Sequence, residues 1–145
     1  MTRTKECEEC FRWPVRVYYE DTDAAGVVYY ANYLRYLERA RTEWLASLGF
    51  TLTALEREHS VIFVVHRLDI EYRQPARLYD ALEVTLGLAE RGRSRMVAVQ
   101  EVYRGGEQLV RALVTLACLD PSTWRPASIP PPVVAKLHYE KRVLD

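Results

Sequence analysis

Hydrophobic and polar residues alternate with a period of two along several stretches of the chain, which is the pattern of β-strands with one buried face. The first stretch is residues 15–20, where Val15, Val17 and Tyr19 alternate with more polar neighbours. Four further stretches of this kind are residues 62–72, 82–88, 96–103 and 109–119. The pattern therefore predicts one early strand and a group of later ones.

Between the first and second of these strands the period changes to that of an amphipathic helix. A set of apolar residues falls on one broad helical face: Tyr33, Leu34, Leu37, Ala40, Trp44, Leu45 and Leu48. Asn32 is placed to cap the N-terminus, and Gly49 to end the helix at its C′ position. We therefore expect a long helix over residues 32–48 and a short second helix over residues 51–58.

Turn signals separate the last strands. The sequence Arg-Gly-Gly-Glu at residues 104–107 favours a hairpin, and Pro121 ends the final strand. No internal repeat or interdomain linker interrupts this order. We expect a single domain over residues 1–145, with a loose lead-in over residues 1–11 and a C-terminal tail over residues 121–145.

One strand, one long helix and then a run of strands joined by turns is the order of an α+β domain. The sheet has to cover the apolar face of a single helix, so a mostly antiparallel sheet is expected to curl around that helix. The last strands are almost continuously hydrophobic in places. One sheet and one helix would leave part of this surface uncovered, which predicts an oligomer.

Composition and charge exclude several classes of protein. With 145 residues, 49% of them hydrophobic, the chain can build a real core. Its 20 basic and 20 acidic residues cancel, which argues against binding nucleic acid through net charge. No apolar run reaches the roughly 18 residues of a membrane span, and the polar start has no apolar signal segment, so we expect a cytoplasmic protein that is not transmembrane.

Cysteine and histidine positions give little support for a metal or redox site. Cys7 and Cys10 have the C-x-x-C spacing, but no second pair supplies the four ligands of a structural zinc site. Cys118 lies in an apolar run and is interpreted as a small buried residue. The histidines are scattered and suggest no nucleophilic triad: His59, His66 and His138. A site formed by His66 with loop carboxylates stays open, but no metal is expected.

The segment before the long helix holds the chemistry. Glu20, Asp21 and Asp23 precede Gly26 and then the helix. A carboxylate near a helix N-terminus can attack an ester-like carbonyl or activate water, and the free N–H groups of the first turn can hold the resulting oxyanion. From the residues alone, a turn or capping role for Asp23 is an equal alternative, and Asp21 is better explained as structural.

This segment and a stretch within the long helix resemble a known family. Residues 21–33, DTDAAGVVYYANY, and residues 38–43, ERARTE, closely resemble the hotdog-fold acyl-CoA thioesterases. The nearest branch resembles the Tol–Pal-associated thioesterases within the 4-hydroxybenzoyl-CoA thioesterase group. Residues 11–20 and 71–78 match as well, so the resemblance covers nearly the whole chain from Phe11.

The resemblance implies a curled antiparallel sheet wrapped around a central helix, sheets that pair into dimers and often tetramers, and active sites at subunit interfaces. It makes Asp23 the catalytic nucleophile or general base and the backbone N–H of Tyr30 the oxyanion donor. Gly26 would let the backbone approach the thioester closely or adopt a positive φ. The Tol–Pal branch often has histidine at the position of Tyr30, whereas the hydroxybenzoyl branch has tyrosine.

The resemblance also implies a substrate and its binding residues. Arg91 and Arg93 match positions where family members hold the phosphates of coenzyme A, although a solvated turn explains them equally well. Val64 and Val65 are candidates for the acyl pocket and equally for the core. The family hydrolyses thioesters without a metal or other cofactor, since coenzyme A is part of the substrate.

The sequence therefore predicts an acyl-CoA thioesterase that releases a free carboxylic acid and coenzyme A. The alternatives are a non-catalytic acyl-CoA-binding or regulatory protein on the same scaffold, and a thioesterase acting on acyl carrier protein. A homodimer or homotetramer is expected, and envelope or lipid-synthesis proteins are possible partners.

Overall fold

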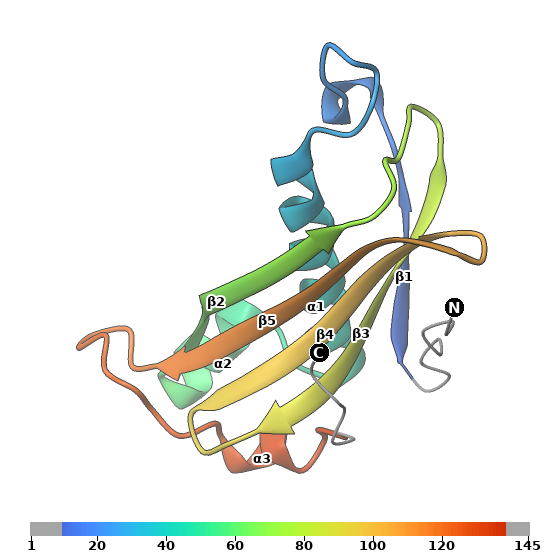
Figure 1. Ribbon diagram of the computed structural model, residues 1–145. Coiled ribbons are helices and arrows are strands. Elements are labelled where there is room, and N and C mark those ends of the chain that lie inside the picture. The colour runs from blue at the N-terminus through green and yellow to red at the C-terminus, as the bar shows by residue number, and fades with distance from the viewer. Residues whose placement is uncertain (1–9, 139–145) are drawn as a thin grey trace.

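The computed structural model describes residues 10–138, and this part of the chain forms a five-stranded antiparallel sheet around one long helix (Figure 1). The strand order across the sheet is β1-β3-β4-β5-β2. The elements are β1 (Phe11–Arg16), α1 (Tyr33–Ser47), α2 (Leu52–His59), β2 (Ile62–Tyr72), β3 (Ala81–Arg91), β4 (Arg95–Arg104), β5 (Glu107–Leu119) and α3 (Pro131–Val134). The predicted α+β class, the order of elements and the wrapped helix are confirmed.

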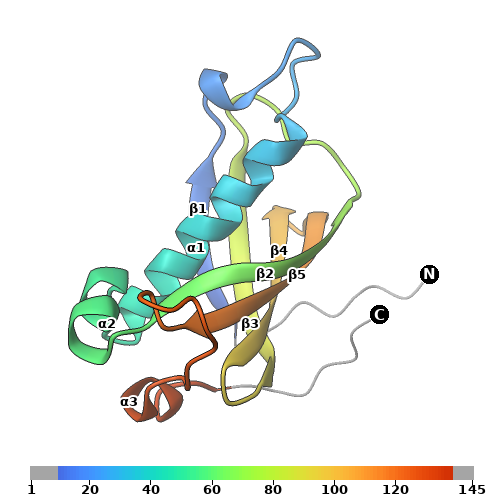
Figure 2. The same ribbon diagram turned by 90° about the vertical axis from the view of Figure 1, so that its left-hand side faces the viewer.

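Helix α1 lies across the concave face of the sheet and supplies one side of the core (Figure 2). Its inward side is fully buried at residues that include Tyr36, Leu37 and Ala40, each no more than 1% exposed. Val84 of β3 and Val114 of β5 are buried in the same cluster. Burying one such large side chain stabilises the fold by about 1.5–3 kcal/mol, so this interface holds the helix firmly against the sheet.

The two ends of α1 differ in how well local sequence predicted them. At the C-terminal end, Gly49 has φ +95°, and its N–H donates to the Ala46 carbonyl at 3.0 Å. The Phe50 N–H donates to the Leu45 carbonyl at 3.0 Å, which completes the glycine-dependent helix stop that was expected. At the N-terminal end, Asn32 stands at the predicted N-cap position, but its side chain makes no capping hydrogen bond, so the capping role is wrong. The expected second helix, α2, is capped by Thr51, since the Thr51 hydroxyl accepts from the Ala54 N–H at 3.1 Å.

The first strand lies earlier in the chain than the alternation predicted. Strand β1 ends at Arg16, opposite the first residue of β3, Ala81. Beyond it Val17 still exchanges backbone hydrogen bonds, since its N–H donates to the Asp80 carbonyl and its carbonyl accepts from the Tyr79 N–H, both at 3.0 Å. The chain then turns through a 3-10 segment, Tyr19–Asp21, and the side chain of Tyr19 is 81% exposed. Phe11 belongs to β1 and not to a loose lead-in, while residues 1–9 lie outside the described part of the chain.

The later strands match their predicted positions, and β2 does so residue for residue. The β4–β5 hairpin turns at Gly105 and Gly106 as expected. Strand β2 carries one bulge, because Val65 pairs with Leu116 and Arg67 with Thr115, which leaves His66 as an extra residue. Within residues 10–138 no helix is both long and apolar enough to cross a membrane.

Candidate active site

The segment between β1 and α1 forms a tight loop at one end of the sheet, at the top of Figure 1. An isolated bridge joins Thr22 to Val28. Inside it, the Asp23 N–H donates to the Val27 carbonyl at 2.9 Å, and the Gly26 N–H donates to the Asp23 carbonyl at 3.0 Å. Gly26 has φ +79°, while a Cβ at this position would meet nothing within 4 Å. The loop therefore requires glycine for its backbone conformation and not for space.

The Asp23 carboxylate lies on the exposed side of this loop. Its Oδ1 accepts a hydrogen bond from the Ala25 N–H at 2.8 Å, which is the geometry of an Asx turn. No donor among residues 10–138 reaches its Oδ2. Within one chain, Oδ1 of Asp23 therefore stabilises the turn, while Oδ2 stays available to a substrate or a water molecule.

The helix start that follows the loop is a 3-10 turn, Tyr30–Asn32, which leads directly into α1 and presents free N–H groups. The Tyr29 N–H donates to the Asp21 carbonyl at 2.9 Å, and the Asn32 N–H donates to the Tyr29 carbonyl at 2.8 Å. Between them, the N–H groups of Tyr30 and Ala31 find no hydrogen-bond acceptor among the described residues. Unpaired N–H groups at the first turn of a helix are suited to hold a developing oxyanion.

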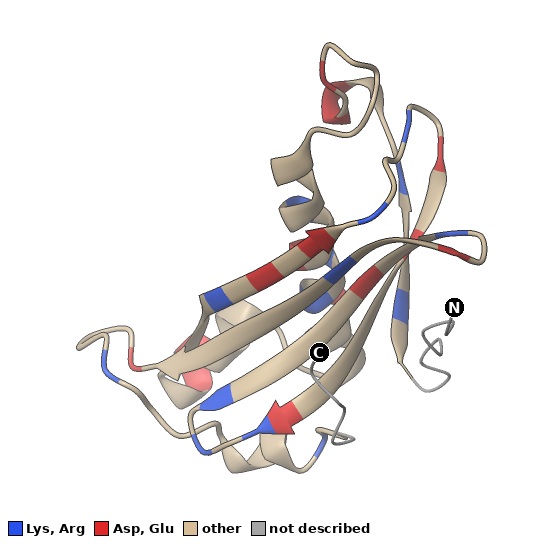
Figure 3. Cartoon of the chain, in the orientation of Figure 1, with Lys and Arg blue, Asp and Glu red and all other residues tan. Residues whose placement is uncertain are grey.

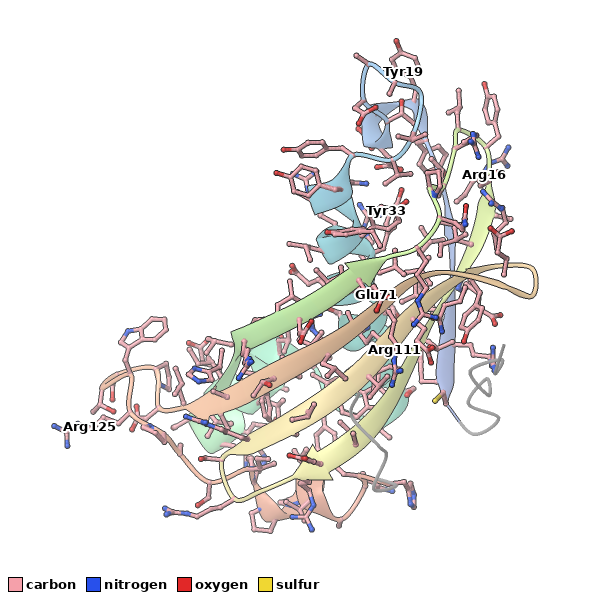
Figure 4. All side chains as sticks on the ribbon, in the orientation of Figure 1. Arg16, Tyr19, Tyr33, Glu71, Arg111 and Arg125 are labelled. Atoms are coloured by element: carbon pink, nitrogen blue, oxygen red, sulfur yellow. The ribbon has the colours of Figure 1, made fainter. Side chains whose placement is uncertain are left out.

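Tyrosine rings surround this helix start and line a cavity. The Tyr72 hydroxyl donates to the Tyr30 carbonyl at 2.9 Å, and the Tyr72 ring lies 6.3 Å from that of Tyr30 and 5.6 Å from that of Tyr33. Figure 4 shows Tyr33 between the helix start and the end of β2, with Tyr19 at the far tip of the loop. The cavity measures about 260 Å³, and its lining residues are Val28, Tyr30, Tyr33, Tyr72, Arg73, Gln74 and Pro75. The role of Tyr72 was missed from the sequence, although it lies in the matched stretch 71–78.

Asp21 is buried below the loop, as the structural interpretation of this residue predicted, with only 4% of its surface exposed. Its Oδ2 accepts from the Tyr18 N–H at 2.9 Å, and its Oδ1 accepts from the side-chain amide of Asn32 at 3.0 Å. This bond explains why Asn32 does not cap α1. The Tyr36 hydroxyl is buried beside the pair, and its pKa is raised first by burial and then by the neighbouring Asp21.

The predicted substrate-binding residues lie away from Asp23 within one chain. Arg91 and Arg93 stand at the β3–β4 turn, at the opposite end of the sheet and roughly 33 Å along β3 from Ala81 (Figure 3). The Arg93 guanidinium donates to the Ser128 hydroxyl at 2.7 Å. Val64 is half-buried and Val65 is 48% exposed, both near the start of β2. One chain therefore brings together Asp23, Gly26 and Tyr30 but not these four residues.

Two weaker arginine candidates lie nearer to the loop. Arg73 donates to Glu71 at 2.9 Å, so its charge is already paired. Arg77 lies beside the loop through the bridge between Val27 and Arg77. Neither position by itself defines a phosphate site.

No metal-ligand cluster and no activated thiol accompanies the loop. Among residues 10–138 no group of three His, Cys, Asp or Glu side chains is placed to hold a metal ion. Cys118 is fully buried, as predicted, and burial raises the pKa of its thiol to about 11. Cys7 of the C-x-x-C pair lies outside the described residues.

A curled antiparallel sheet around one helix, with an acidic loop leading into the helix, defines the hotdog class of folds. The family comparison agrees, since residues 17–137 match the model of the thioesterase-like superfamily. The chain belongs to this superfamily of thioester hydrolases.

Individual relatives support this assignment. The acyl-CoA thioester hydrolase YbgC of Escherichia coli O6:H1 strain CFT073 is 44% identical over 127 residues, which cover 87% of this chain and 94% of the relative. The structure of Slr0204, a 1,4-dihydroxy-2-naphthoyl-CoA thioesterase from Synechocystis, superposes with a TM-score of 0.82 at 25% identity, covering 88% of this chain and 95% of that one. A Thermus thermophilus thioesterase in complex with coenzyme A and Zn superposes with a TM-score of 0.75 at 30% identity, covering 87% of this chain and 90% of that one.

Proposed function

We propose that this protein hydrolyses an acyl-CoA thioester to a free carboxylic acid and coenzyme A, with Asp23 as nucleophile or general base. One observation supports the proposal most directly. The loop that exposes Asp23 leads within a few residues to the unpaired N–H groups of Tyr30 and Ala31. The acyl-CoA thioester hydrolase name of the Escherichia coli relative and the coenzyme A bound to the Thermus protein favour the substrate class.

The reaction needs an attacking oxygen and a stabilised oxyanion. An Asp23 oxygen bonds to the thioester carbonyl carbon, or it removes a proton from a water molecule that does so. The carbonyl oxygen gains the negative charge and accepts from the Tyr30 N–H. The C–S bond then breaks and the thiolate of coenzyme A leaves. When water is the attacking group, this step gives the free acid directly. When Asp23 attacks, an acyl–Asp23 anhydride remains, and water then hydrolyses it to release the acid and restore the Asp23 carboxylate. One such backbone donor typically supplies about 2.7–4 kcal/mol of transition-state stabilisation.

The exposure of Asp23 and the distance to the other candidates point to a second subunit, and we propose a homodimer that pairs through β2. Both β1 and β2 are sheet edges, but β1 has only 6 residues and contains Pro14, whereas β2 has 11 residues. A two-fold pairing centred on Leu68 sets Arg67 opposite Asp69 in both directions. A pairing centred on Arg67 or on Asp69 would set like charges opposite each other, which is unfavourable.

This pairing accounts for the remaining predicted residues. The antiparallel two-fold sets the start of one β2 beside the end of the other, so Val64 of the partner subunit falls near Tyr72 and the tyrosine-lined cavity. It also turns the partner's β3–β4 turn toward the end of the sheet where Asp23 lies. Arg91 and Arg93 are then proposed to meet the phosphates of coenzyme A. A tetramer, a cytoplasmic location and envelope or lipid-synthesis partners stay predictions.

Thiol release from a panel of short, long and aromatic acyl-CoAs tests the function, comparing the wild type with Asp23→Asn. Asparagine can keep the Asx turn, so the loop is retained while the basic oxygen is lost. We expect kcat to fall by about 10²–10⁴-fold. Asp120→Asn is the matched control, because the Asp120 carboxylate accepts from the Ser122 N–H at 2.8 Å in the same kind of turn, outside the proposed site.

Three outcomes separate the competing interpretations. Full activity of Asp23→Asn would remove Asp23 from the chemistry. A wild type that binds acyl-CoA without releasing thiol would favour the binding protein. Turnover of an acylated carrier protein that free coenzyme A does not inhibit would favour the carrier-protein substrate.

A further inference from the structure

A buried carboxylate and a buried amide hold the two ends of the catalytic loop. Asp21 precedes the loop and Asn32 ends it, and their side chains are joined at 3.0 Å with 4% and 7% of their surfaces exposed. The Asp21 backbone carbonyl also accepts from the Tyr29 N–H at 2.9 Å. Two bonds of different kinds thus close the loop at its base.

The same carboxylate also ties the loop to the sheet. Its second oxygen accepts from the Tyr18 N–H at 2.9 Å, just after β1 ends at Arg16. Asp21 therefore contacts three parts of the chain: the end of the first strand, the return of the loop and the start of the helix. Asp23 follows it by two residues, and Tyr30 precedes Asn32 by two.

We propose that Asp21 and Asn32 are positioning residues that set the Asp23 carboxylate and the Tyr30 N–H at their working separation. The catalytic part of this inference rests on the proposed function of Asp23. Neither side chain touches the substrate, because both are buried. Both carboxylate oxygens of Asp21 and the side-chain N–H of Asn32 are already hydrogen-bonded to protein groups. They act by fixing the loop whose two ends carry the reacting carboxylate and the oxyanion donor.

The substitution Asn32→Asp tests the pair, because it replaces the donated hydrogen bond by two carboxylates in contact. A displacement of about 1 Å in a site of this kind can cost about 100-fold in rate. We expect kcat to fall by about that factor with KM little changed. The amide proton of Tyr29, which is bonded to the Asp21 carbonyl, should exchange with solvent faster.

The reciprocal double substitution Asp21→Asn/Asn32→Asp is the rescue. The amide placed at position 21 can accept from the Tyr18 N–H through its oxygen and donate through its nitrogen to the carboxylate placed at position 32. We expect this variant to recover most of kcat and the slow exchange of the Tyr29 amide. A destabilised fold without a positioning role would not be repaired in both measurements together.

The matched control is Gln108→Glu. Gln108 donates to the buried carboxylate of Glu101, so the substitution again sets two carboxylates together, but in the β4–β5 hairpin and not at the catalytic loop. We expect a lower melting temperature with kcat of the folded protein and Tyr29 exchange unchanged. Equal loss of kcat in Asn32→Asp and Gln108→Glu would overturn the proposal, as would wild-type kcat in Asn32→Asp or a double variant that recovers nothing.

The exchange measurement separates this inference from the proposed function. If Asp23→Asn keeps full activity, the catalytic assignment fails, and faster Tyr29 exchange in Asn32→Asp still shows that the pair closes the loop. If Asp23→Asn is inactive and Asn32→Asp keeps both kcat and slow exchange, only the positioning inference fails.

Discussion

Two regions of this molecule contain the same chemical pair, a buried acid joined to a side-chain amide, in different surroundings. At the loop end, Asn32 donates to Asp21, and at the β4–β5 hairpin, Gln108 donates to Glu101. Both acids are nearly inaccessible, with 4% and 3% of their surfaces exposed. The residue types and the burial of the acid therefore do not distinguish the two pairs.

What distinguishes the two pairs is how the backbone around each is held. Glu101 pairs with Arg111 across the ladder, and Tyr103 with Gln108, so strand hydrogen bonds already fix the hairpin. The loop after Asp21 has only an isolated bridge and a few turn bonds. A buried side-chain hydrogen bond should affect catalysis only where few other hydrogen bonds fix the conformation of the surrounding backbone. We therefore expect the same chemical change to alter catalysis at one pair and only stability at the other.

The largest effect that this comparison predicts comes from Asp21→Ala. The substitution leaves the Tyr18 N–H and the Asn32 amide without their acceptor, and each buried unpaired group costs about 1–3 kcal/mol. We expect the free energy of unfolding to fall by about 2–4 kcal/mol and kcat by about 100-fold. Glu101→Ala should destabilise the fold without changing kcat. Urea denaturation and steady-state kinetics check both, and similar kcat losses would contradict the comparison.

A smaller effect is expected from the glycines at the two ends of the loop–helix unit. Gly26 in the loop and Gly49 after α1 both have positive φ, +79° and +95°, and a Cβ would meet nothing within 4 Å at either. Alanine at each should therefore cost a similar amount, about 1–2 kcal/mol of backbone strain. Only Gly26→Ala should also lower kcat, because only it reshapes the loop that carries Asp23. Thermal melts and kcat values for the two variants provide the check, and loss of activity in Gly49→Ala would contradict it.

Local patterns predicted the parts of the fold that depend on local physics. The long helix follows from its apolar face and from Gly49, whose positive φ ends it. The β-strands from β2 onward follow from alternation. The residues Asp23, Gly26 and Tyr30 could be grouped from the sequence because they share one short segment of the chain.

The errors come from partners that are distant in the sequence. Asn32 has the composition of a helix cap, but its amide is used by Asp21, 11 residues away. Tyr19 continues an alternating pattern, yet no partner strand extends past Ala81 to pair with it. The Tyr72 hydroxyl reaches the Tyr30 carbonyl across 42 residues, a distance at which periodicity carries no information. In the proposed dimer, the placement of Val64 and Arg91 at the site depends on a second chain, which one sequence does not position.

The next prediction concerns Tyr72, which supports the same helix start from the side of the sheet. Tyr72→Phe removes the hydrogen bond to the Tyr30 carbonyl and keeps the ring in the cavity. A neutral hydrogen bond contributes about 0.5–1.5 kcal/mol, and Tyr72 is 42% exposed, so water can replace part of it. We expect less than about a tenfold fall in kcat and little change in melting temperature. A loss as large as that of Asp21→Ala would mean that Tyr72, and not the buried pair, sets the helix start.

The smallest effect is expected from Asp80→Asn. The Asp80 carboxylate lies close to the catalytic loop but does not form the hydrogen bonds that close it. Burial alone would raise the pKa of Asp80, but the Arg77 N–H at 2.9 Å and the Arg104 guanidinium at 2.8 Å outweigh burial and lower it. A lowered pKa in the folded state gives stability that is present above the unfolded-state pKa and is lost as the pH falls through the folded-state value. Asp80→Asn should therefore be less stable than wild type at pH 7, by no more than about 1 kcal/mol, and should match it in strong acid.

The kinetics of Asp80→Asn decide whether proximity to the loop is enough to affect catalysis. The Asp80 carboxylate accepts a hydrogen bond from the Arg77 N–H, and Arg77 forms an isolated β-bridge with Val27 of the loop. Neither residue closes the loop at its base. We expect kcat to stay at the wild-type value, and we expect added salt to shrink the stability difference because the ion pair with Arg104 is screened. A fall in kcat comparable to that of Asn32→Asp would show that any charge beside the loop can set its geometry. The contrast between the Asp21 and Glu101 pairs would then reflect distance from the site and not the way the backbone is held.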